Sequence, residues 1–562
     1  MTTPVRWPEP SLEGTMMDYP LTLPRVLEHA AKIFGKTEIA SRMPDRSIHR
    51  ETYVDLHRRA RALGRALQDA GLKRGDRVAT LMWNHYAHME TYFGAPAAGG
   101  VLHTLNLRLH PNDIAYIANH ASDRFLVLDD VLLPLFDKFS RAVNFERVLV
   151  VPLTGKPVPP PYLNYEEFLK GAKGELEYPD LDEKEAAAMC YTSGTTGRPR
   201  GVVYSHRAIY LHSLGLLLSD FTGLSSRDTL CPVVPMFHAN AWGLPFAAPM
   251  VGTKLVYPGP YLDPPSLLDL FEQERVTVTA GVPSIWLGMI GTLQKEPARW
   301  SLAKGMKMIV GGSAVPESMI RAYDKFGLRV IQAWGMTETA PLGTLSFLKG
   351  GMDSLTDDEK YGYRAKQGIP APLVEVRVVN DRGMAPWDGK TTGELQVRGP
   401  WVAARYHNLP EAGENWSEDG WFRTGDVAAI DAEGYVRITD RIKDLIKSGG
   451  EWISSVDVEN AIMGHPAVAE AAVVAVPHPK WQERPLAVVV LRADFKGKVQ
   501  PDELRSFIAP KFASWWLPDA IVFADELPKT GTGKVAKILL RDQYKEWKWA
   551  EPPVPRDTAP SM

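Results

Sequence analysis

Apolar side chains recur along the chain with two different periods, which predict helices alternating with strands. In residues 51–72 the apolar positions are spaced three and four apart and end at Gly71, a pattern typical of an amphipathic helix. The run VATLMW at 78–83 follows and predicts a buried strand. Similar β-rich runs stand near residues 126, 147, 276, 307 and 328, mostly separated by helix-like segments. This alternation predicts an α/β fold with largely parallel sheets.

The pattern changes after about residue 370, where short strands are separated by Gly, Asp and Pro turns. EVRVVND, ELQVRG and YVRIT are such strands, and their spacing predicts a small β-rich unit. A compact α/β segment then begins, and the proline-rich last residues predict a disordered tail. The predicted organisation is an N-terminal unit at 1–440, a boundary at 441–447, a C-terminal unit at 448–546 and a tail at 547–562.

Composition and charge exclude several classes of protein. The 562 residues suffice for two to four structural units, and the fractions of hydrophobic (45%) and charged (23%) residues are those of a globular protein. The 64 basic and 67 acidic side chains give a net charge of −3, which argues against nucleic acid as a partner. An anion site, if present, must therefore be local.

The cysteines and the apolar runs predict a cytoplasmic location. Cys190 and Cys231 are the only cysteines, and both lie in apolar stretches, which argues against disulfides or a thiolate metal site. The first twenty residues contain prolines and acids where a signal peptide needs an apolar run. No uninterrupted apolar stretch approaches the roughly eighteen residues of a membrane span, although transient membrane contact stays open.

The stretch TSGTTGRPRG at 192–201 has the composition of a loop that wraps phosphate. It follows a predicted strand, AAMCY, and precedes another, GVVYS, whereas a Walker loop opens a helix. Backbone amides, hydroxyls and Arg200 would therefore have to hold the phosphate. The alternative is a solvent-exposed turn.

The stretch QAWGMTETAP at 332–341 places Thr337 and Glu338 after a predicted strand. A glutamate beside a hydroxyl is a suitable hard ligand for a magnesium ion that bridges ATP phosphates, and Trp334 is suited to stack on adenine. The alternative is a helix N-cap at Thr337 with Glu338 in the first turn.

Two further motifs follow. In WFRTGD at 421–426, Asp426 is placed to accept both ribose hydroxyls, with an ordinary β-turn aspartate as the alternative. PKTGTGK at 528–534 is not a Walker loop, because Pro528 replaces the first glycine and Val535 replaces the hydroxyl residue after Lys534. Its lysine on a Gly-rich turn is still a mobile charge suited to phosphate.

These four motifs, in this order, resemble the acyl-CoA synthetase branch of the adenylate-forming superfamily. The resemblance runs from about Met16 to Tyr544 and includes GGSAVP at 311–316 and DRIKDLIKSGGEWISS at 440–455. It implies a large N-terminal adenylate-forming domain of two α/β subdomains plus a small β-barrel-like unit, and a small hinged C-terminal α+β domain. It also implies ATP and CoA as co-substrates, Mg²⁺ as cofactor and a homodimer.

The resemblance assigns roles to positions of this sequence. The residues implied in ATP or AMP binding are Thr192, Ser193, Gly194, Thr195, Thr196, Gly197, Arg200, Gly312, Ser313, Ala314, Gln332, Ala333, Trp334, Gly335, Met336, Thr337, Asp426 and Arg441. Those implied in catalysis are Lys534, Thr337 and Glu338, with Glu338 and Thr192 on the metal. Lys443 falls at the hinge, and those implied in CoA binding are Lys447, Gly449, Gly450 and Glu451.

Three positions depart from the pattern of the family. Arg200 stands where lysine is usual, which keeps the charge but replaces a point ammonium by a fork. Trp334 replaces the commoner tyrosine, which preserves stacking, and Lys443 replaces the frequent hinge aspartate, as in the long-chain fatty acid branch. The first substitution bears on loop closure more than on binding.

The stretch VPMFHANAWG at 234–243 bears on the acid that is activated. Its lack of a carboxylate favours a substrate with an uncharged tail, in contrast to amino-acid-activating relatives. Trp242 matches a tryptophan that gates the acyl tunnel in long-chain fatty acyl-CoA synthetases. The residues expected to line the acyl pocket are His238, Trp242, Val282 and Trp286, with core packing as the alternative for the aromatic ones.

A medium- or long-chain fatty acyl-CoA ligase is therefore the main hypothesis for function. Methylthiopropionate-CoA ligases, whose substrate needs a short pocket, resemble the stretch WGMTETAPLGT about as well. An adenylating enzyme that loads a separate carrier protein stays open as a third alternative.

Overall fold

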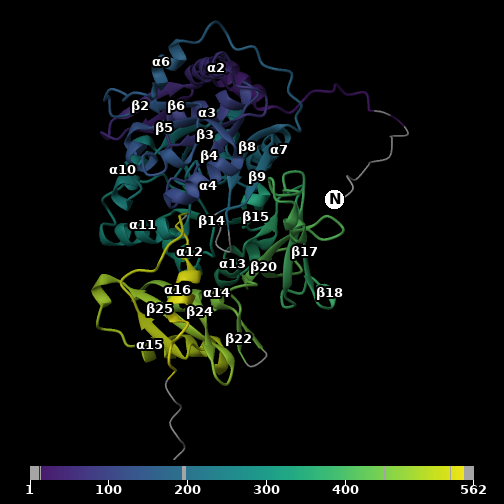
Figure 1. Cartoon of the computed structure of the whole chain (residues 1–562). Coiled ribbons are helices and arrows are strands. Elements are labelled where there is room, and N and C mark those ends of the chain that lie inside the picture. Colours follow the sequence, from purple (N-terminus) through teal and green to yellow (C-terminus); the bar gives the residue numbers. More distant parts are fainter. Residues whose placement is uncertain (1–11, 13, 193–197, 449–450, 532, 550–562) are drawn as a thin grey trace, which may run out of the picture.

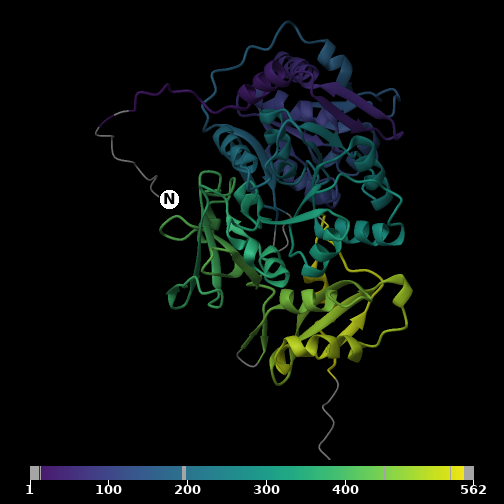
Figure 2. The same ribbon diagram turned by 180° about the vertical axis from the view of Figure 1, so that it is seen from behind.

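The computed structural model describes residues 12, 14–192, 198–448, 451–531 and 533–549. Two large sheets with their helices form the upper part of the molecule in Figure 1, a smaller green sheet lies beside them, and the yellow C-terminal unit lies below. Figure 2 shows the same arrangement from behind. The predicted α/β fold class, with a large N-terminal and a small C-terminal part, is confirmed.

The first large sheet has seven strands within the described residues, and every neighbouring pair is parallel except β8 with β9. Its order is β7 (Leu163–Asn164), β6 (Arg147–Val151), β5 (Asp123–Asp129), β3 (Arg77–Leu81), β4 (Val101–Thr104), β8 (Ala186–Tyr191) and β9 (Gly201–Ser205). The strands predicted near residues 78, 126 and 147 are thus confirmed.

The second large sheet has nine strands in the part of the chain that is described. Its order is β16 (Ile369–Pro370), β15 (Leu342–Leu345), β14 (Arg329–Gly335), β13 (Lys307–Gly311), β12 (Val278–Gly281), β10 (Thr229–Pro232), β11 (Lys254–Tyr257), β1 (Glu38–Arg42) and β2 (Ile48–Thr52). The central strands are parallel, and antiparallel hairpins close both edges.

Helices cover the two sheets and share one core with them. The helix predicted at 51–72 is α2 (Tyr53–Asp69), and it begins there because Thr52 and Asp55 form a capping box. Buried residues of several helices belong to this core, including Leu27 of α1, Phe93 of α3 and Phe246 of α9. The bounds are α1 (Leu23–Phe34), α3 (Tyr86–Ala97), α4 (Pro111–Ala121), α5 (Leu133–Phe136), α6 (Tyr165–Lys170), α7 (His206–Leu217), α8 (Ala239–Trp242), α9 (Leu244–Val251), α10 (Pro264–Glu274), α11 (Pro283–Lys295), α12 (Glu317–Asp324) and α13 (Asp357–Arg364).

The predicted small β-rich unit is an antiparallel sheet of five described strands. Its order is β18 (Gly383–Met384), β17 (Glu375–Asn380), β19 (Gly393–Arg398), β20 (Phe422–Ile430) and β21 (Val436–Arg441). Val378, Leu395 and Ala428 bury one face of this sheet in the core shared with the two large sheets. The connection from β19 to β20 therefore lies against the N-terminal unit.

The C-terminal unit has its own sheet and its own core. The strands are β22 (Ile446–Ser448), β23 (Glu451–Ile453), β24 (Val468–His478), β25 (Gln482–Leu491) and β26 (Ala520–Phe523), and the helices are α14 (Ser455–Met463), α15 (Pro501–Ile508) and α16 (Lys537–Tyr544). The boundary predicted at 441–447 spans the connection from β21 to β22 and overlaps the end of β21 and the start of β22. Among the described residues, no helix is long and apolar enough to span a bilayer.

Parallel strands of one sheet end at a common edge, and ligands of open α/β sheets bind there. In the nine-stranded sheet, His238 follows β10, Val282 follows β12, Gly312 follows β13 and Thr337 follows β14, whereas Thr192 follows β8 of the seven-stranded sheet. The fold therefore brings residues from four distant segments to neighbouring strand ends of one sheet.

Candidate active site

The phosphate motif begins and ends on a closed hairpin. The Thr192 amide donates to the Arg200 carbonyl (2.9 Å), and the Arg200 amide donates to Thr192 Oγ1 (3.1 Å). Since β9 follows the loop, the prediction of a strand–loop–strand motif without a helix directly behind it is confirmed. The predicted residues Ser193, Gly194, Thr195, Thr196 and Gly197 lie outside the described residues.

The predicted adenine pocket follows β13 and β14. Gly312, with a φ of 92°, begins the turn that contains Ser313 and Ala314, while Ala333 and Gly335 belong to β14. The Gln332 amide accepts from the Val315 amide (2.8 Å) and donates to the Ala365 carbonyl (3.1 Å). The Gln332 side chain therefore links the backbone at Val315 to the backbone at Ala365, next to the predicted pocket.

Trp334 contacts the predicted ribose-binding aspartate. Its indole N–H donates to Asp426 Oδ2 at 2.9 Å, and its ring packs against Gly343, where a Cβ atom would lie 2.5 Å from the ring. A phenylalanine could stack but could not donate this bond. The sequence suggested stacking alone for this position, because Asp426 lies 92 residues away.

Asp426 and Arg441 face each other on neighbouring strands. They are register partners on β20 and β21, and Arg441 Nε lies 2.9 Å from Asp426 Oδ1. The charge of Asp426 raises the pKa of Arg441. Asp426 is inside a strand, so the alternative of an ordinary β-turn aspartate is wrong; Gly425, which suggested a turn, has a φ of 70° within β20. The Asp426 carboxylate is therefore held from two sides, by the Trp334 indole and by the Arg441 guanidinium.

Glu338 lies in a short helical turn and is buried. The N-cap of this turn is Met336, so the alternative that placed Thr337 at the N-cap is wrong. The Tyr406 hydroxyl donates to Glu338 Oε1 (2.6 Å), and the Tyr204 hydroxyl donates to the Thr337 carbonyl (2.7 Å). Burial raises the pKa of Glu338, whereas the Tyr406 hydrogen bond opposes the rise. Both tyrosines were missed by the sequence analysis.

Lys534 approaches the same strand ends from the C-terminal unit. Its hairpin is closed by the Thr530 amide, which donates to the Lys534 carbonyl (2.7 Å), and Ser284 Oγ donates to the Gly533 carbonyl (3.2 Å). A Cβ atom on Gly312 would lie 3.1 Å from Lys534 Cε. Figure 1 shows the yellow segment reaching up towards β14 and α11.

The charge of Lys534 depends on its surroundings. Burial, together with the charge of Arg441, lowers the pKa of Lys534 to about 8, although the charges of Asp426 and Glu338 oppose this shift. All four side chains therefore act on one another electrostatically. The structure thus brings Lys534, Gly312, Glu338 and the Asp426–Arg441 pair into one site.

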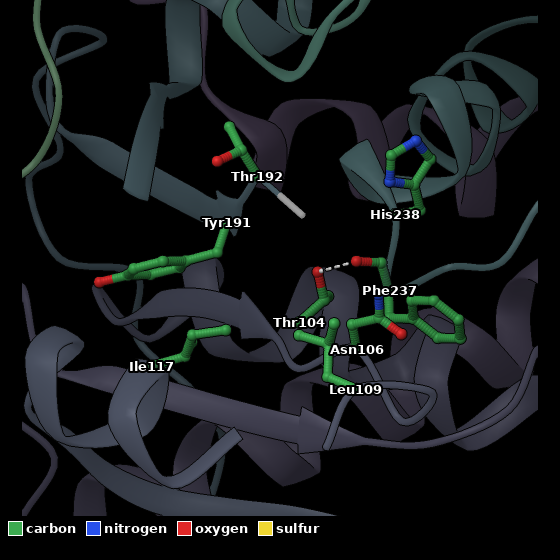
Figure 3. Close-up of a pocket in the computed structure, with 8 residues that line it drawn as sticks. All are labelled: Thr104, Asn106, Leu109, Ile117, Tyr191, Thr192, Phe237 and His238. Atoms are coloured by element: carbon green, nitrogen blue, oxygen red, sulfur yellow. Dashed lines mark hydrogen bonds between the residues drawn. The ribbon is translucent and has the colours of Figure 1, made fainter. Parts of the chain in front are cut away.

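The predicted acyl-pocket residues are only partly brought together. His238 and Thr192 line the pocket of Figure 3, whose other lining residues are Thr104, Asn106, Leu109, Ile117, Tyr191 and Phe237. Burial, together with the charges of Lys534 and Arg108, lowers the pKa of His238 to about 3, so it is neutral at pH 7. A Cβ atom on Gly312 would lie 3.4 Å from Val282, which places Val282 beside Lys534.

The two predicted tryptophans of this pocket differ. Trp242 ends a turn in which Ala239, Asn240, Ala241 and Trp242 all have φ between 42° and 58°, a conformation that costs roughly 1–2 kcal/mol per residue. Its ring edge would lie 3.4 Å from a Cβ atom on Gly311, at the end of β13. Trp286 is fully buried in the core with Met308 and Tyr323, so core packing accounts for it.

The predicted CoA residues lie away from this site, whereas the predicted hinge residue Lys443 lies close enough for its charge to lower the pKa of Lys534. Lys443 stands between β21 and β22, and Lys447 in β22 faces Trp452 across the β22–β23 hairpin. Gly449 and Gly450 lie outside the described residues, and only the backbone of Glu451 is described. Figures 1 and 2 show this hairpin on the far side of the C-terminal unit from the segment that reaches the N-terminal unit.

The two predicted metal ligands fit magnesium by their chemistry. The Glu338 carboxylate and the Thr192 hydroxyl are hard oxygen donors. No group of three or more His, Cys, Asp or Glu side chains in the described part of the chain is suited to hold a metal alone. Magnesium commonly uses one or two protein oxygens together with substrate phosphates, so this sparse set fits Mg²⁺ bound with ATP.

Comparisons with known proteins agree with this geometry. The AMP-binding enzyme family matches residues 27–407, and the AMP-binding enzyme C-terminal domain matches residues 457–534. A long-chain-fatty-acid–CoA ligase of Thermus thermophilus is 50% identical over 95% of this chain and 97% of its own. A 3-methylmercaptopropionyl-CoA ligase of Ruegeria pomeroyi is 43% identical over 95% and 99%, and a medium-chain-fatty-acid–CoA ligase of Ectopseudomonas oleovorans is 43% identical over 94% and 97%.

Solved structures share the fold. An anthranilate CoA ligase in complex with anthranoyl-AMP has a TM-score of 0.82 at 24% identity, covering 94% of this chain and 98% of its own. ATP-bound MatB from Rhodopseudomonas palustris has a TM-score of 0.79 at 26% identity, covering 94% and 99%. The resemblance inferred from the four motifs is confirmed, and the chain belongs to the AMP-binding enzyme family.

Proposed function

We propose that the protein is an ATP-dependent acyl-CoA ligase for a medium- or long-chain fatty acid. It converts the acid and ATP to an acyl-adenylate and pyrophosphate, then transfers the acyl group to CoA and releases AMP. The observation that carries the proposal is the approach of Lys534, from the C-terminal unit, to Gly312 beside Glu338 and the Asp426–Arg441 pair. A cation, a buried carboxylate and a ribose-sized hydrogen-bonding pair form one site.

The first step is in-line attack of the substrate carboxylate on the α-phosphate of ATP. Such a reaction asks the protein mainly to position the reactants and stabilise charge. Asp426, held by Trp334 and Arg441, orients the ribose, and the Lys534 ammonium stabilises negative charge on the phosphate. Glu338 and Thr192 would hold Mg²⁺, which would neutralise part of the charge on the ATP phosphates when bound.

The second step is attack of the CoA thiol on the acyl carbonyl, which expels AMP. No protein nucleophile takes part, which agrees with the burial of both cysteines. We propose that the C-terminal unit turns about Lys443, withdraws Lys534 and brings Lys447, Gly449, Gly450 and Glu451 to the pantetheine arm. The position of the β22–β23 hairpin, away from the site that Lys534 reaches, supports the need for such a rotation.

The substrate class is supported by the relatives and by one stretch of sequence. Two of the relatives are named as ligases of long- and medium-chain fatty acids. The neutral His238 and the absence of a carboxylate in 234–243 agree with an uncharged acyl tail. The alternative substrate, methylthiopropionate, is supported by the 43% identical 3-methylmercaptopropionyl-CoA ligase.

One assay separates these alternatives: pyrophosphate release and thioester formation with acids of about three to eighteen carbons and with methylthiopropionate, with and without CoA. We expect CoA-dependent thioester with the longer acids. A preference for methylthiopropionate would select the alternative substrate. Pyrophosphate release without CoA thioester would instead indicate a carrier protein as acceptor and would contradict the proposal.

We further propose that the enzyme works as a cytoplasmic homodimer. The location is supported by two buried, unpaired cysteines, which suit a reducing compartment. The dimer rests on the family resemblance. Light scattering coupled to size-exclusion chromatography tests the dimer, and a monomer would contradict it. Fractionation of cells that express the protein tests the location, and a membrane-bound protein would contradict it.

A further inference from the structure

The connection between β19 and β20 touches both halves of the nucleotide site. The Ala403 amide donates to the Glu338 carbonyl (2.7 Å), and the His407 amide donates to the Gly201 carbonyl (2.8 Å). Between these two anchors lies Tyr406, only 6% exposed. The backbone of this segment therefore fixes the turn that carries Glu338 relative to the end of the phosphate hairpin.

The Tyr406 side chain also links the Glu338 turn to the phosphate hairpin. Its hydroxyl donates to Glu338 Oε1 at 2.6 Å, and its ring lies beneath the Arg200 guanidinium, whose Cζ is 5.2 Å from the ring centroid. Arg200 Nη1 also donates to Asn415 Oδ1 (2.9 Å), and the Arg200 amide donates to Thr192 Oγ1 (3.1 Å). One tyrosine thus contacts the carboxylate and the cation that flank the phosphate site.

The ring itself is held rigidly. Trp416 packs edge-on against Tyr406 with centroids 5.3 Å apart, and the Trp416 indole N–H donates to the Ala403 carbonyl (2.8 Å). Trp416 in turn packs on Phe422 of β20. These contacts hold the ring in the place from which its hydroxyl donates to Glu338.

We propose that Tyr406 is a positioning residue that holds the Glu338 carboxylate for Mg²⁺·ATP and couples it to Arg200. With Oε1 occupied by the hydroxyl, Glu338 presents its other oxygen, so the carboxylate has one fixed orientation. Hydrogen bonds to a metal-ligating carboxylate typically change metal affinity roughly 10–100-fold. The inference rests on the proposed function, since that function assigns Mg²⁺·ATP to this site.

The test is Tyr406→Phe, which removes the hydroxyl and keeps the ring contacts to Trp416 and Arg200. The matched control is Tyr435→Phe, because the Tyr435 hydroxyl donates to the Phe347 carbonyl at 2.7 Å, away from Glu338. ATP binding is measured calorimetrically with and without Mg²⁺, in the absence of acid and CoA. This readout stays valid even if the enzyme activates a different acid, so failure of the proposed function is distinguishable.

We expect Tyr406→Phe to lower the Mg²⁺-dependent gain in ATP affinity by roughly tenfold and to raise the Mg²⁺ concentration for half-maximal pyrophosphate release similarly. ATP binding without Mg²⁺ and the KM for the acid should change little. Tyr435→Phe should leave all these values unchanged. Equal losses of ATP affinity with and without Mg²⁺, or unchanged Mg²⁺ dependence, would overturn the inference.

A double-mutant cycle guards against a purely structural effect. In Glu338→Gln, where the charged metal ligand is already lost, adding Tyr406→Phe should not change the Mg²⁺ dependence further. A full additional tenfold loss in that background would mean that Tyr406 acts independently of Glu338 and would refute the proposal. Melting temperatures of the four proteins show whether each is folded, and the cycle still decides the question when Tyr406→Phe alone is destabilised.

Discussion

The two Gly- and Thr-rich hairpins of the site, at 192–201 and 528–534, each have a basic residue near their end, Arg200 and Lys534, but hold its side chain differently. Arg200 is fixed by Asn415, by the Tyr406 ring and by backbone bonds to Thr192. Lys534 comes from the other unit, and burial lowers its pKa to about 8. The comparison suggests that the two cations have different roles. Arg200, the fixed cation, shapes the nucleotide site, and Lys534, the cation delivered by the C-terminal unit, stabilises the reacting phosphate.

The largest expected effect is that of Lys534→Ala. Removing a group that stabilises developing charge typically costs about 10²–10³ in rate, so pyrophosphate release should fall by that factor. Thioester formation from a supplied acyl-adenylate and CoA should stay near the wild-type rate, because the proposed rotation of the C-terminal unit would withdraw Lys534 in that step. Rapid-quench measurement of the two half-reactions separates them.

The matched control is Lys529→Ala in the same hairpin, because Lys529 instead pairs with Glu470 at 2.7 Å. Both half-reactions should then stay within about twofold of wild type, as expected for a surface ion pair. If Lys534→Ala released pyrophosphate at the wild-type rate, the delivered cation would have no role in adenylation.

The second effect is on the pH profile. A lysine stabilises phosphate only when protonated, so a pKa of about 8 predicts that kcat/KM for ATP is highest below that pH and falls above it. The fall should be about tenfold between pH 7 and pH 9. Arginine stays protonated in this range, so whatever activity Lys534→Arg retains should lack the falling limb. An identical limb in Lys534→Arg would assign it to another group.

The sequence predicted these hairpins and strand ends well, because each depends on local signals. The runs before Thr192 and Thr337 have strand periodicity, and the glycines mark turns. The sequence predicted a turn directly before Asp426 because Gly425 precedes it. Gly425 does have a positive φ, but it lies within β20. Local patterns do not distinguish a turn glycine from one within a strand.

Contacts between distant residues were not predictable. Tyr406 meets Glu338 across 68 positions, and no periodicity around ARYHN marks that tyrosine. Trp286 was assigned to the acyl pocket with core packing as an alternative, and an apolar pattern cannot say which side of β12 and β13 a helix residue faces. Such questions depend on how the sheets pack.

A smaller effect is expected from loosening the docked hairpin. Ser284→Ala removes the bond to the Gly533 carbonyl, which is worth about 0.5–1.5 kcal/mol. Pyrophosphate release should fall by roughly threefold while thioester formation is unchanged. Ser354→Ala, which removes a similar hydroxyl-to-carbonyl bond to Gly351 in an exposed turn, is the control and should change neither rate. Equal effects on both half-reactions would show that Ser284 does not act through docking.

The smallest effect tests the fixed cation. Arg200→Lys keeps the charge but loses the hydrogen bond from Nη1 to Asn415 and the planar contact over the Tyr406 ring, since lysine is a point donor. A cation–π contact and a hydrogen bond of this kind are each worth about 0.5–1 kcal/mol, which predicts a roughly two- to fourfold rise in KM for ATP with kcat nearly unchanged. Asn415→Ala should give a similar rise, because it removes the same bond from the other side. A loss of kcat as large as that of Lys534→Ala would place Arg200 on the reacting phosphate and remove the distinction between the two hairpins. The ratio of kcat in Arg200→Lys to kcat in Lys534→Ala therefore measures how far the two cations differ in role.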